Sequence, residues 1–352
     1  MPKDSTVHVG FVGAGAICRS RHLPGLGRIE GVRVVAVANR SRGSSQQVAA
    51  DFAIPHVVDD WRQLVERDDI DAVFIGTWPY MHRDISLAAL ASGKHVFCQA
   101  RMAMDLAEAK QMLAAAEAHR GLVNMVCPPP TRMPFEPYIK QMLASGKLGK
   151  ITAVELLSVS GANLDANAVT WRERVEFSGK QALLMGIYAE TLNAWLGPYE
   201  TLSAHTATPV ATKRDEQGSE VPIGIPQVMT IAGKLVGGAV AVEHHMGLAA
   251  DKTTTTDRIT VWGLKGTLRH RFLTDTIEYA PAGEPLRKVD VPAQLRRDWC
   301  VEADFIAAVR AAMRGEAWSV SPDFAEALRY MQKVEAVHLS ALTGRAVNPS
   351  KL

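Results

Sequence analysis

The chain has 352 residues, of which 47% are hydrophobic and 22% charged, and its formal net charge is +2. A chain of this length normally exceeds one hydrophobic core, so two domains are expected. The small net charge and the scattered Lys and Arg residues argue against binding to nucleic acid or to an anionic membrane. We expect no membrane span, because no apolar run is long enough, and no signal peptide, because the N-terminus lacks an apolar segment.

The four cysteines give no sign of a metal site or a disulfide framework. Cys18, Cys98, Cys127 and Cys300 lie far apart, without C-x-x-C spacing and without a neighbouring group of histidines. This pattern is typical of reduced thiols, and it predicts a cytoplasmic protein that binds no metal.

A glycine-rich turn follows the first predicted strand, residues 7–12, and opens a helix that runs toward Leu26. The first glycine permits a tight turn, and the second lets a pyrophosphate approach the helix N-terminus, where unpaired N–H groups favour an anion. A glycine turn alone is weak evidence, but a second buried strand, residues 32–38, follows at the distance that a βαβ unit requires. The predicted cofactor contacts of this turn are Gly13, Gly15, Ala16 and Ile17.

The residues that end the second strand predict which dinucleotide binds. An acidic side chain there would bind the ribose 2′-hydroxyl of NAD and repel the 2′-phosphate of NADP. This chain has Asn39, Arg40, Ser41 and Arg42 instead. A neutral amide, two guanidinium groups and a hydroxyl suit a 2′-phosphate better, so NADP is the first choice and NAD the second. The alternative, in which both arginines are solvated loop residues, stays open.

Strands and helices alternate through the first 127 residues. This alternation predicts a dinucleotide-binding α/β Rossmann domain, a doubly wound parallel sheet, over residues 1–127. The further expected strands are 72–75, 95–97 and 122–126, and the expected helices are 44–52, 61–67, 83–92 and 106–119.

Three consecutive prolines, residues 128–130, mark the boundary, because proline fixes φ and cannot continue a strand. Alternating strands separated by Gly and Pro then predict an α+β domain over residues 128–352, with an open, mostly antiparallel sheet. Two C-terminal helices, 298–313 and 323–342, are expected to pack back toward the first domain.

Three motifs together resemble the glucose-fructose oxidoreductase / inositol dehydrogenase / MocA (Gfo/Idh/MocA) family. They are Gly13-Ala14-Gly15, Thr77-Trp78-Pro79-Tyr80-Met81-His82 and Gly93-Lys94-His95-Val96. The resemblance implies the same two-domain architecture and NAD(P)-linked chemistry on a hydroxyl carbon of a sugar, cyclitol or related compound. It also implies a homo-oligomer, a dimer or tetramer formed through the C-terminal sheet. The cofactor contacts that it implies are Thr77, Trp78, Pro79, His82, Gln99, Ala100, Trp171 and Arg172.

Both proton-handling positions of that family are changed in this chain. The usual Glu-Lys-Pro motif reads Gln99-Ala100-Arg101, so the lysine is missing. The usual Gly-x-His-x-x-Asp motif reads Gly186-Ile187-Tyr188-Ala189-Glu190-Thr191, so Tyr188 replaces the acid/base histidine. Two changes at one reaction centre indicate either different chemistry or none.

The predicted catalytic residues are therefore Tyr188, Arg101 and Gln99. A phenol normally titrates near pH 10, and a neighbouring cation such as Arg101 would stabilise its phenolate. Arg101 is itself a poor base, so it is expected to orient the substrate or bind an anion. Structural alternatives stay open: Tyr188 as a packing residue, and Trp171 with Arg172 as an aromatic plug beside a solvated arginine.

Three functions follow, in descending order of preference. The first is an NADP-linked oxidoreductase that acts on a small polar compound and has non-standard acid/base residues. The second is a redox-neutral lyase or hydrolase-like enzyme with a tightly bound NAD(P) that is reduced and reoxidised within each cycle. The third is a non-catalytic dinucleotide-binding sensor, which the intact glycine turn and retained cleft residues disfavour.

Overall fold

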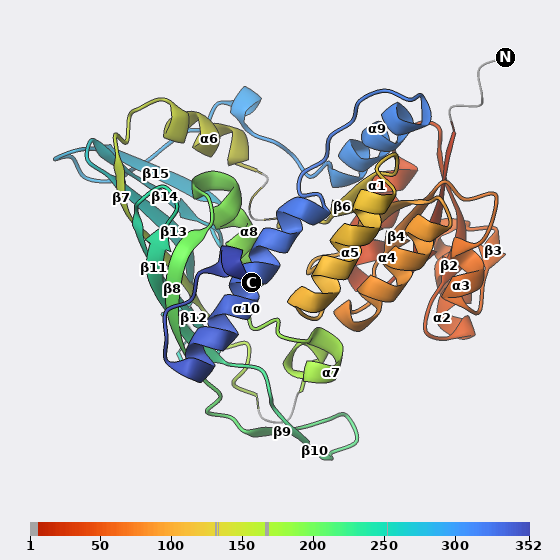
Figure 1. The fold of residues 1–352 in the computed structure, drawn as a ribbon, viewed down its shortest axis with the longest axis horizontal. Coiled ribbons are helices and arrows are strands. Elements are labelled where there is room, and N and C mark those ends of the chain that lie inside the picture. The colour runs from red at the N-terminus through yellow and green to blue at the C-terminus, as the bar shows by residue number, and fades with distance from the viewer. Residues whose placement is uncertain (1–5, 131, 133, 166–168, 252) are drawn as a thin grey trace. The chain divides into compact units, whose positions relative to one another are not determined.

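The computed structural model describes residues 6–130, 132, 134–165, 169–251 and 253–352. It divides the chain into two compact units (Figure 1). Unit 1 comprises Met1–Pro128 and Cys300–Leu328, and unit 2 comprises Pro129–Trp299 and Arg329–Leu352. Unit 1 thus takes up a C-terminal segment in addition to the N-terminal part of the chain. The predicted domain boundaries, 1–127 and 128–352, stay predictions.

Unit 1 is built on a six-stranded sheet in the order β3-β2-β1-β4-β5-β6, in which every pairing is parallel. The predicted doubly wound α/β fold is confirmed. Its strands are β1 (Val7–Val12), β2 (Val32–Ala38), β3 (His56–Val57), β4 (Ala72–Ile75), β5 (His95–Cys98) and β6 (Asn124–Val126).

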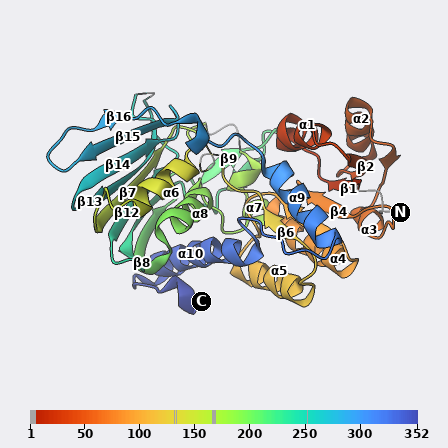
Figure 2. The same cartoon turned by 90° about the horizontal axis from the view of Figure 1, so that it is seen from above.

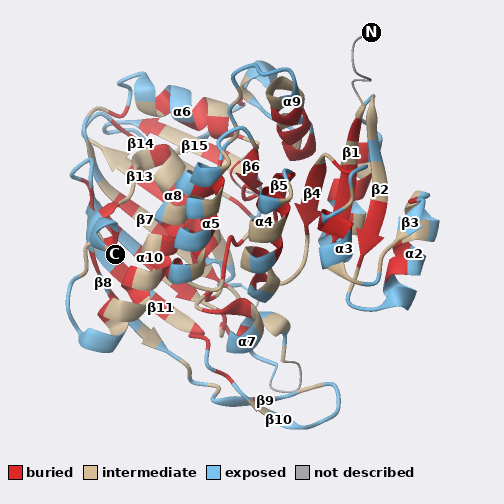
Figure 3. Cartoon of the chain, turned by 45° about the vertical axis from the view of Figure 1, so that its right-hand side comes forward, coloured by how far each residue is buried: buried red, intermediate tan, exposed pale blue. Residues whose placement is uncertain are grey.

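Helices cover the sheet of unit 1, and its central strands are almost completely buried (Figure 3). Continuous apolar strands are expected for a parallel sheet that is covered on both faces. The helical segments are η1 (Cys18–His22), α1 (Leu23–Gly27), α2 (Arg42–Phe52), α3 (Trp61–Val65), η2 (Pro79–Met81), α4 (His82–Ala91), α5 (Leu106–Ala118) and α9 (Val301–Met313).

A cluster of phenylalanine rings joins α9 to the sheet. Phe74 of β4 stacks on Phe97 of β5 with ring centroids 4.4 Å apart, and Phe305 of α9 meets Phe74 edge-on at 5.3 Å. Phe305 is fully buried. Residues from near the end of the chain therefore complete the core of the N-terminal fold. Large aromatic side chains of this kind contribute much of the buried area of a core.

Unit 2 is built on an eight-stranded sheet in the order β16-β15-β14-β13-β7-β12-β11-β8. Its pairings are antiparallel except for β12 with β7, so the predicted open, mostly antiparallel sheet is confirmed. The strands are β7 (Ile151–Val159), β8 (Tyr199–Ala207), β11 (Val228–Leu235), β12 (Val240–Met246), β13 (Thr256–Gly263), β14 (Gly266–Arg271), β15 (Thr276–Pro281) and β16 (Arg287–Lys288); a separate hairpin pairs β9 (Thr212–Arg214) with β10 (Glu220–Pro222).

Helices pack on one face of this sheet and leave the other face open (Figures 1 and 2). On β12 the alternation is strict: Ala241, Glu243 and His245 are buried, whereas Val240 and Val242 are exposed. The remaining segments are α6 (Glu136–Ala144), η3 (Trp171–Glu173), α7 (Val175–Ser178), α8 (Met185–Leu196), η4 (Ala293–Leu295), α10 (Phe324–Thr343) and η5 (Pro349–Lys351). Among the described residues, no helix is both long and apolar enough to cross a bilayer.

Replacement of Phe305 by Ala should lower the free energy of unfolding of unit 1 by about 3–5 kcal/mol, because it removes a buried ring from the aromatic cluster. Urea denaturation monitored by circular dichroism measures the effect. Met313→Ala, at an exposed position of the same helix, is the matched control and should change stability little. Equal effects of the two substitutions would contradict the packing role of α9.

Candidate functional site

The glycine turn of unit 1 borders a cavity at the carboxyl ends of β1, β2 and β4. Gly13 has a φ of +82°, and a Cβ atom there would lie 2.6 Å from the backbone nitrogen of Thr77. At Gly15 an added Cβ would meet nothing within 4 Å, so the backbone is open to a ligand. The cavity has a volume of about 600 Å³, and its lining includes Val12, Gly13, Ala14, Gly15, Asn39, Arg40, Ser41, Ser44, Gly76, Thr77, Trp78, Tyr80 and Met81.

This cavity fits a dinucleotide. The hydroxyl of Thr77 is buried and has no hydrogen-bond partner among the described residues. An orphaned hydroxyl in a cavity wall is satisfied when a polar ligand enters. Ala16 and Ile17, predicted with the turn, are exposed at the start of the helical segment and do not line the cavity.

Asn39 fastens the end of β2 to the glycine turn. Its Oδ1 accepts a hydrogen bond from the backbone N–H of Ala14 at 2.7 Å, and its Nδ2 donates to the hydroxyl of Ser44 at 2.9 Å. Ser41 caps α2 by accepting from the N–H of Ser44. The position that would bear a carboxylate in an NAD-specific site is thus occupied by a neutral, structurally engaged amide.

The two arginines after Asn39 differ in their surroundings. Arg40 lines the cavity, with its guanidinium 5.8 Å from the ring centroid of Trp78. Arg42 forms an ion pair with Asp59 at 2.6 Å, with both side chains exposed. Arg40 is therefore better placed to bind an anion in the cavity than Arg42, although exposed ion pairs open at little cost.

The corner after β5 is fixed by a chain of hydrogen bonds. Oε1 of Gln99 accepts from the N–H of Ala100, so the Gln99 amide nitrogen must be the donor to Nε2 of His22, at 3.0 Å. This fixes the tautomer of His22, whose Nδ1–H donates to the carboxylate of Glu302 on α9 at 2.5 Å. His22 and Glu302 are fully buried. Both ends of the Gln99 amide are thus used to position the corner.

His82 links two loops at the same sheet edge. Its Nε2 lies 2.9 Å from the carbonyl of Thr77, and its Nδ1 lies 2.9 Å from the carbonyl of Arg101. The ring is completely buried, and burial lowers its pKa. This geometry suits a residue that positions the loops around Pro79 and Arg101. Arg101 is itself buried, and Ala100 is half-buried.

Tyr188 lies on α8 of unit 2, where it is 1% exposed, and its hydroxyl donates to the carboxylate of Asp257 on β13. Burial and the nearby charge of Asp257 raise the pKa of the phenol well above its usual value. The predicted phenolate, stabilised by a cation, is therefore not favoured, because the neighbour of Tyr188 is a carboxylate. Thr191 donates back to the carbonyl of Ile187 on its own helix.

The turn that carries Trp171 and Arg172 is fixed by Glu173. The buried carboxylate of Glu173 binds the Lys213 ammonium at 2.8 Å and accepts a hydrogen bond from the Asn163 amide at 2.8 Å. The guanidinium of Arg172 stacks over the ring of Trp171 at 4.3 Å. Burial lowers the pKa of Arg172, and desolvation of this kind favours contact with an anion.

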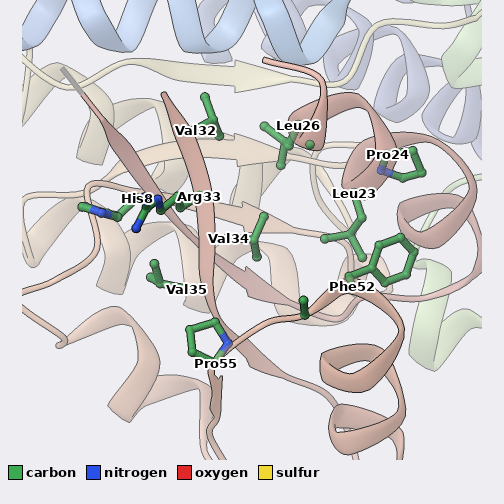
Figure 4. Close-up of a pocket in the computed structure, with 12 residues that line it drawn as sticks. His8, Leu23, Pro24, Leu26, Val32, Arg33, Val34, Val35, Phe52 and Pro55 are labelled. Carbon is green, nitrogen blue, oxygen red and sulfur yellow. The ribbon is translucent and has the colours of Figure 1, made fainter. Parts of the chain in front are cut away.

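A second cavity in unit 1, of about 570 Å³, does not fit a dinucleotide (Figure 4). Its lining is mainly apolar, with side chains such as Leu23, Val34 and Phe52, and His8 and Arg33 at one side. None of the predicted site residues lines it.

Sequence reasoning missed three residues of the two sites: His22, Glu302 and Asp257. His22 and Glu302 are partners that lie 280 residues apart in the sequence, and Asp257 lies 69 residues from its partner Tyr188. No local spacing signals such pairs. The available signal for a buried pair was a histidine and a glutamate, each among apolar neighbours in its helical segment.

Comparison with known families agrees with this geometry. Residues 7–126 match the oxidoreductase family with an NAD-binding Rossmann fold, and residues 138–269 match the GFO/IDH/MocA C-terminal domain. The chain belongs to the Gfo/Idh/MocA family. The predicted resemblance is confirmed.

Levoglucosan dehydrogenase of Pseudarthrobacter phenanthrenivorans is 26% identical over 236 residues, which are 61% of this chain and 60% of that protein. Inositol 2-dehydrogenase of Serratia proteamaculans is 32% identical over 41% of this chain and 43% of its own length. These alignments span less than two thirds of the curated relatives. A solved structure of levoglucosan dehydrogenase with NADH and L-sorbose superimposes with a TM-score of 0.86 over 97% of this chain and 98% of that one, at 21% identity, which shows a shared fold.

Replacement of His22 by Leu should destabilise the protein by about 3–5 kcal/mol, because it removes the donor to a buried carboxylate. Loss of an exposed ion pair costs only about 0–1 kcal/mol, so Arg42→Leu, which breaks the pair with Asp59, is the matched control. Chemical denaturation at neutral pH compares the two variants. A His22→Leu protein as stable as the control would refute the role of the Glu302–His22–Gln99 chain.

Proposed function

We propose that this protein is an NAD(P)-dependent oxidoreductase that acts on a hydroxyl or carbonyl carbon of a sugar, cyclitol or related small polar compound. The observation that carries the proposal is the glycine turn beside a cavity whose wall contains the orphaned Thr77 hydroxyl. When bound, the dinucleotide supplies a nicotinamide that exchanges a hydride with a substrate carbon. The relatives named levoglucosan dehydrogenase and inositol 2-dehydrogenase support the substrate class.

The chain's own residues bind the cofactor and position the substrate. Gly13 and Gly15 let the pyrophosphate approach the backbone, and the Thr77 hydroxyl hydrogen-bonds the cofactor. Gln99 and His82 hold the corner that bears Arg101, whose guanidinium orients the substrate. Tyr188, predicted as the acid/base residue, is proposed to act in the second unit as a neutral hydrogen-bond donor, because its buried phenol lies beside the carboxylate of Asp257. Trp171 and Arg172 are proposed cofactor or substrate contacts.

NADP is the proposed cofactor, with NAD as the second choice. Asn39 brings no negative charge to the ribose position, and Arg40 lines the cavity next to the Ser41 hydroxyl. These groups match a 2′-phosphate, which accepts charge-assisted hydrogen bonds. Asp59 and Asp60 also line the cavity, but Asp59 is paired with Arg42 and Asp60 caps α3.

We also propose a homo-oligomer formed through the open face of the unit 2 sheet and a location in the cytoplasm. Val240 and Val242, on the outward side of β12, are 56% and 43% exposed, and contiguous exposed apolar surface favours association. In the part of the chain that the structure describes, none of the four cysteines forms a disulfide, as is usual in a reducing compartment.

Arg40→Ala should weaken NADP binding by about 10- to 100-fold, because one charge-assisted hydrogen bond contributes about 1.5–3 kcal/mol. NAD binding should change little. Isothermal titration calorimetry with both dinucleotides measures the two effects. Arg42→Ala is the matched control and should weaken NADP binding less, because Asp59 already pairs with that arginine. Equal losses for NADP and NAD would overturn the proposed 2′-phosphate contact.

Mixing the protein with NADP and a panel of polyols should give steady formation of NADPH, followed by its absorbance. Product formed without net change in absorbance would instead indicate the redox-neutral enzyme, which the missing lysine at Ala100 and missing histidine at Tyr188 make a second candidate. Absence of any dinucleotide binding would refute both functions.

A further inference from the structure

Three polar side chains form a row across the helix-covered face of the unit 2 sheet, directly beneath Tyr188. His245 on β12 pairs with Ser158 on β7, and Ser158 pairs with Asp257 on β13. Residues directly opposite one another in a sheet project from the same face. Tyr188 of α8 lies over this row, with its ring 6.0 Å from that of His245 and its hydroxyl bonded to Asp257.

The row differs from the apolar packing around it. Burial and Asp257 raise the pKa of the Tyr188 phenol, and the neighbouring Ser158 hydroxyl opposes this rise. Asp257 is half-buried, and its second oxygen, Oδ1, is buried without a hydrogen-bond partner among the described residues. A buried carboxylate oxygen without a partner is costly, so its retention indicates a use other than stability.

The charged side chains near Asp257 pair with other groups, and among the residues that the structure describes Asp257 itself forms no ion pair. His245 is paired with Glu243 at 3.0 Å, and Glu243 also binds the Lys333 ammonium and the Tyr199 hydroxyl. Burial lowers the pKa of His245, which keeps the ring neutral. The neighbouring Arg258 pairs with Glu155, and these residues belong to the opposite face of the sheet.

We infer that Asp257 is the catalytic residue that accepts the substrate hydroxyl proton, and that Tyr188 is a positioning residue that holds its carboxylate. This inference rests on the proposed oxidoreductase function. In the oxidation, the substrate O–H bond breaks and its proton passes to Asp257. The freed electron pair forms the C=O bond, and a bound NAD(P)⁺ would accept the carbon's hydrogen with both electrons of the C–H bond and so be reduced. Reduction of a carbonyl runs the same step in reverse, with Asp257 returning the proton.

The acidity of Asp257 agrees with this role. Burial raises the pKa of its carboxyl to about 6, and the hydrogen bond from Tyr188 opposes the rise. A general base works best when its pKa lies near the operating pH. Asp257 is therefore ionised at neutral pH and able to take up a proton, whereas the Tyr188 phenol stays protonated.

The first test measures acidity without turnover. Titration of the aspartate carboxyl carbons by NMR in the protein without added ligand should assign to Asp257 a pKa near 6. In Tyr188→Phe that value should rise, because the substitution removes the hydrogen bond that stabilises the carboxylate. An Asp257 that titrates near the ordinary aspartate value of about 3.9, or that is unchanged in Tyr188→Phe, would overturn the pairing.

The second test separates the residues by activity. Asp257→Asn should lower kcat by about 100-fold or more while leaving the Kd for NADP unchanged. The matched control is Asp290→Asn, the same change at an exposed position of unit 2, which should behave as wild type. Tyr188→Phe should retain measurable turnover, with the acidic limb of its kcat/KM profile moved to higher pH.

The outcomes distinguish the inference from the proposed function. If the wild-type protein binds NADP and reduces it with a polyol but Asp257→Asn is equally active, only the inference fails. If Tyr188→Phe abolishes turnover and Asp257→Asn does not, Tyr188 is itself the acid/base residue and the inference is overturned. If the wild-type protein neither binds nor reduces a dinucleotide, the proposed function is refuted, and the inference that rests on it is refuted as well.

Discussion

The loops at the carboxyl edge of the parallel sheet depend on buried hydrogen bonds from side chains of other loops. Sheet hydrogen bonding ends at this edge, so the loop backbone needs partners from elsewhere. Asn39 supports the glycine turn, the His82 ring lies between the carbonyls of Thr77 and Arg101 and can donate to one of them, and His22 couples Gln99 to Glu302. The cavity keeps its form because these contacts join segments that the sheet alone does not hold together.

Unit 2 distributes its buried charge in two ways. The charge of Glu243 is balanced by its neighbours. Burial alone would raise the pKa of its carboxyl, but Lys333 and His245 lower that pKa to about 2. Asp257 receives a hydrogen bond from a neutral phenol but no ion pair among the described residues, and its pKa is raised instead. A compensated carboxylate is typical of structural networks, whereas an uncompensated one next to a hydrogen-bond donor is typical of proton-transfer sites.

The sequence predicted the fold wherever local signals were strong. The alternation of strands and helices predicted the Rossmann sheet, and most predicted helices lie within a few residues of the observed ones, for example 106–119 against Leu106–Ala118. The two-residue strand β3 was missed, because so short a segment carries no periodicity. The expected strand 122–126 is shorter in the structure, Asn124–Val126.

The candidate site was predictable in part. The glycine turn and several residues after β2 line the cavity, and sequence could indicate them because their positions depend on local backbone and spacing. The roles of Gln99, His82 and Tyr188 could not be distinguished from sequence, because each depends on a partner supplied by a distant segment, such as Glu302 or Asp257. Side-chain chemistry alone did not reveal that Gln99 and His82 bind other parts of the protein.

The aromatic cluster around Phe305 has a consequence for biosynthesis. The strands of unit 1 are made first, but Phe305 and Glu302, which cover Phe74 and bind His22, belong to a segment that begins at Cys300. A ribosome must therefore translate all of residues 129–299 before the first unit can close its core. Until then the apolar surface that Phe305 covers stays exposed in the nascent chain, and exposed apolar surface of this kind favours aggregation.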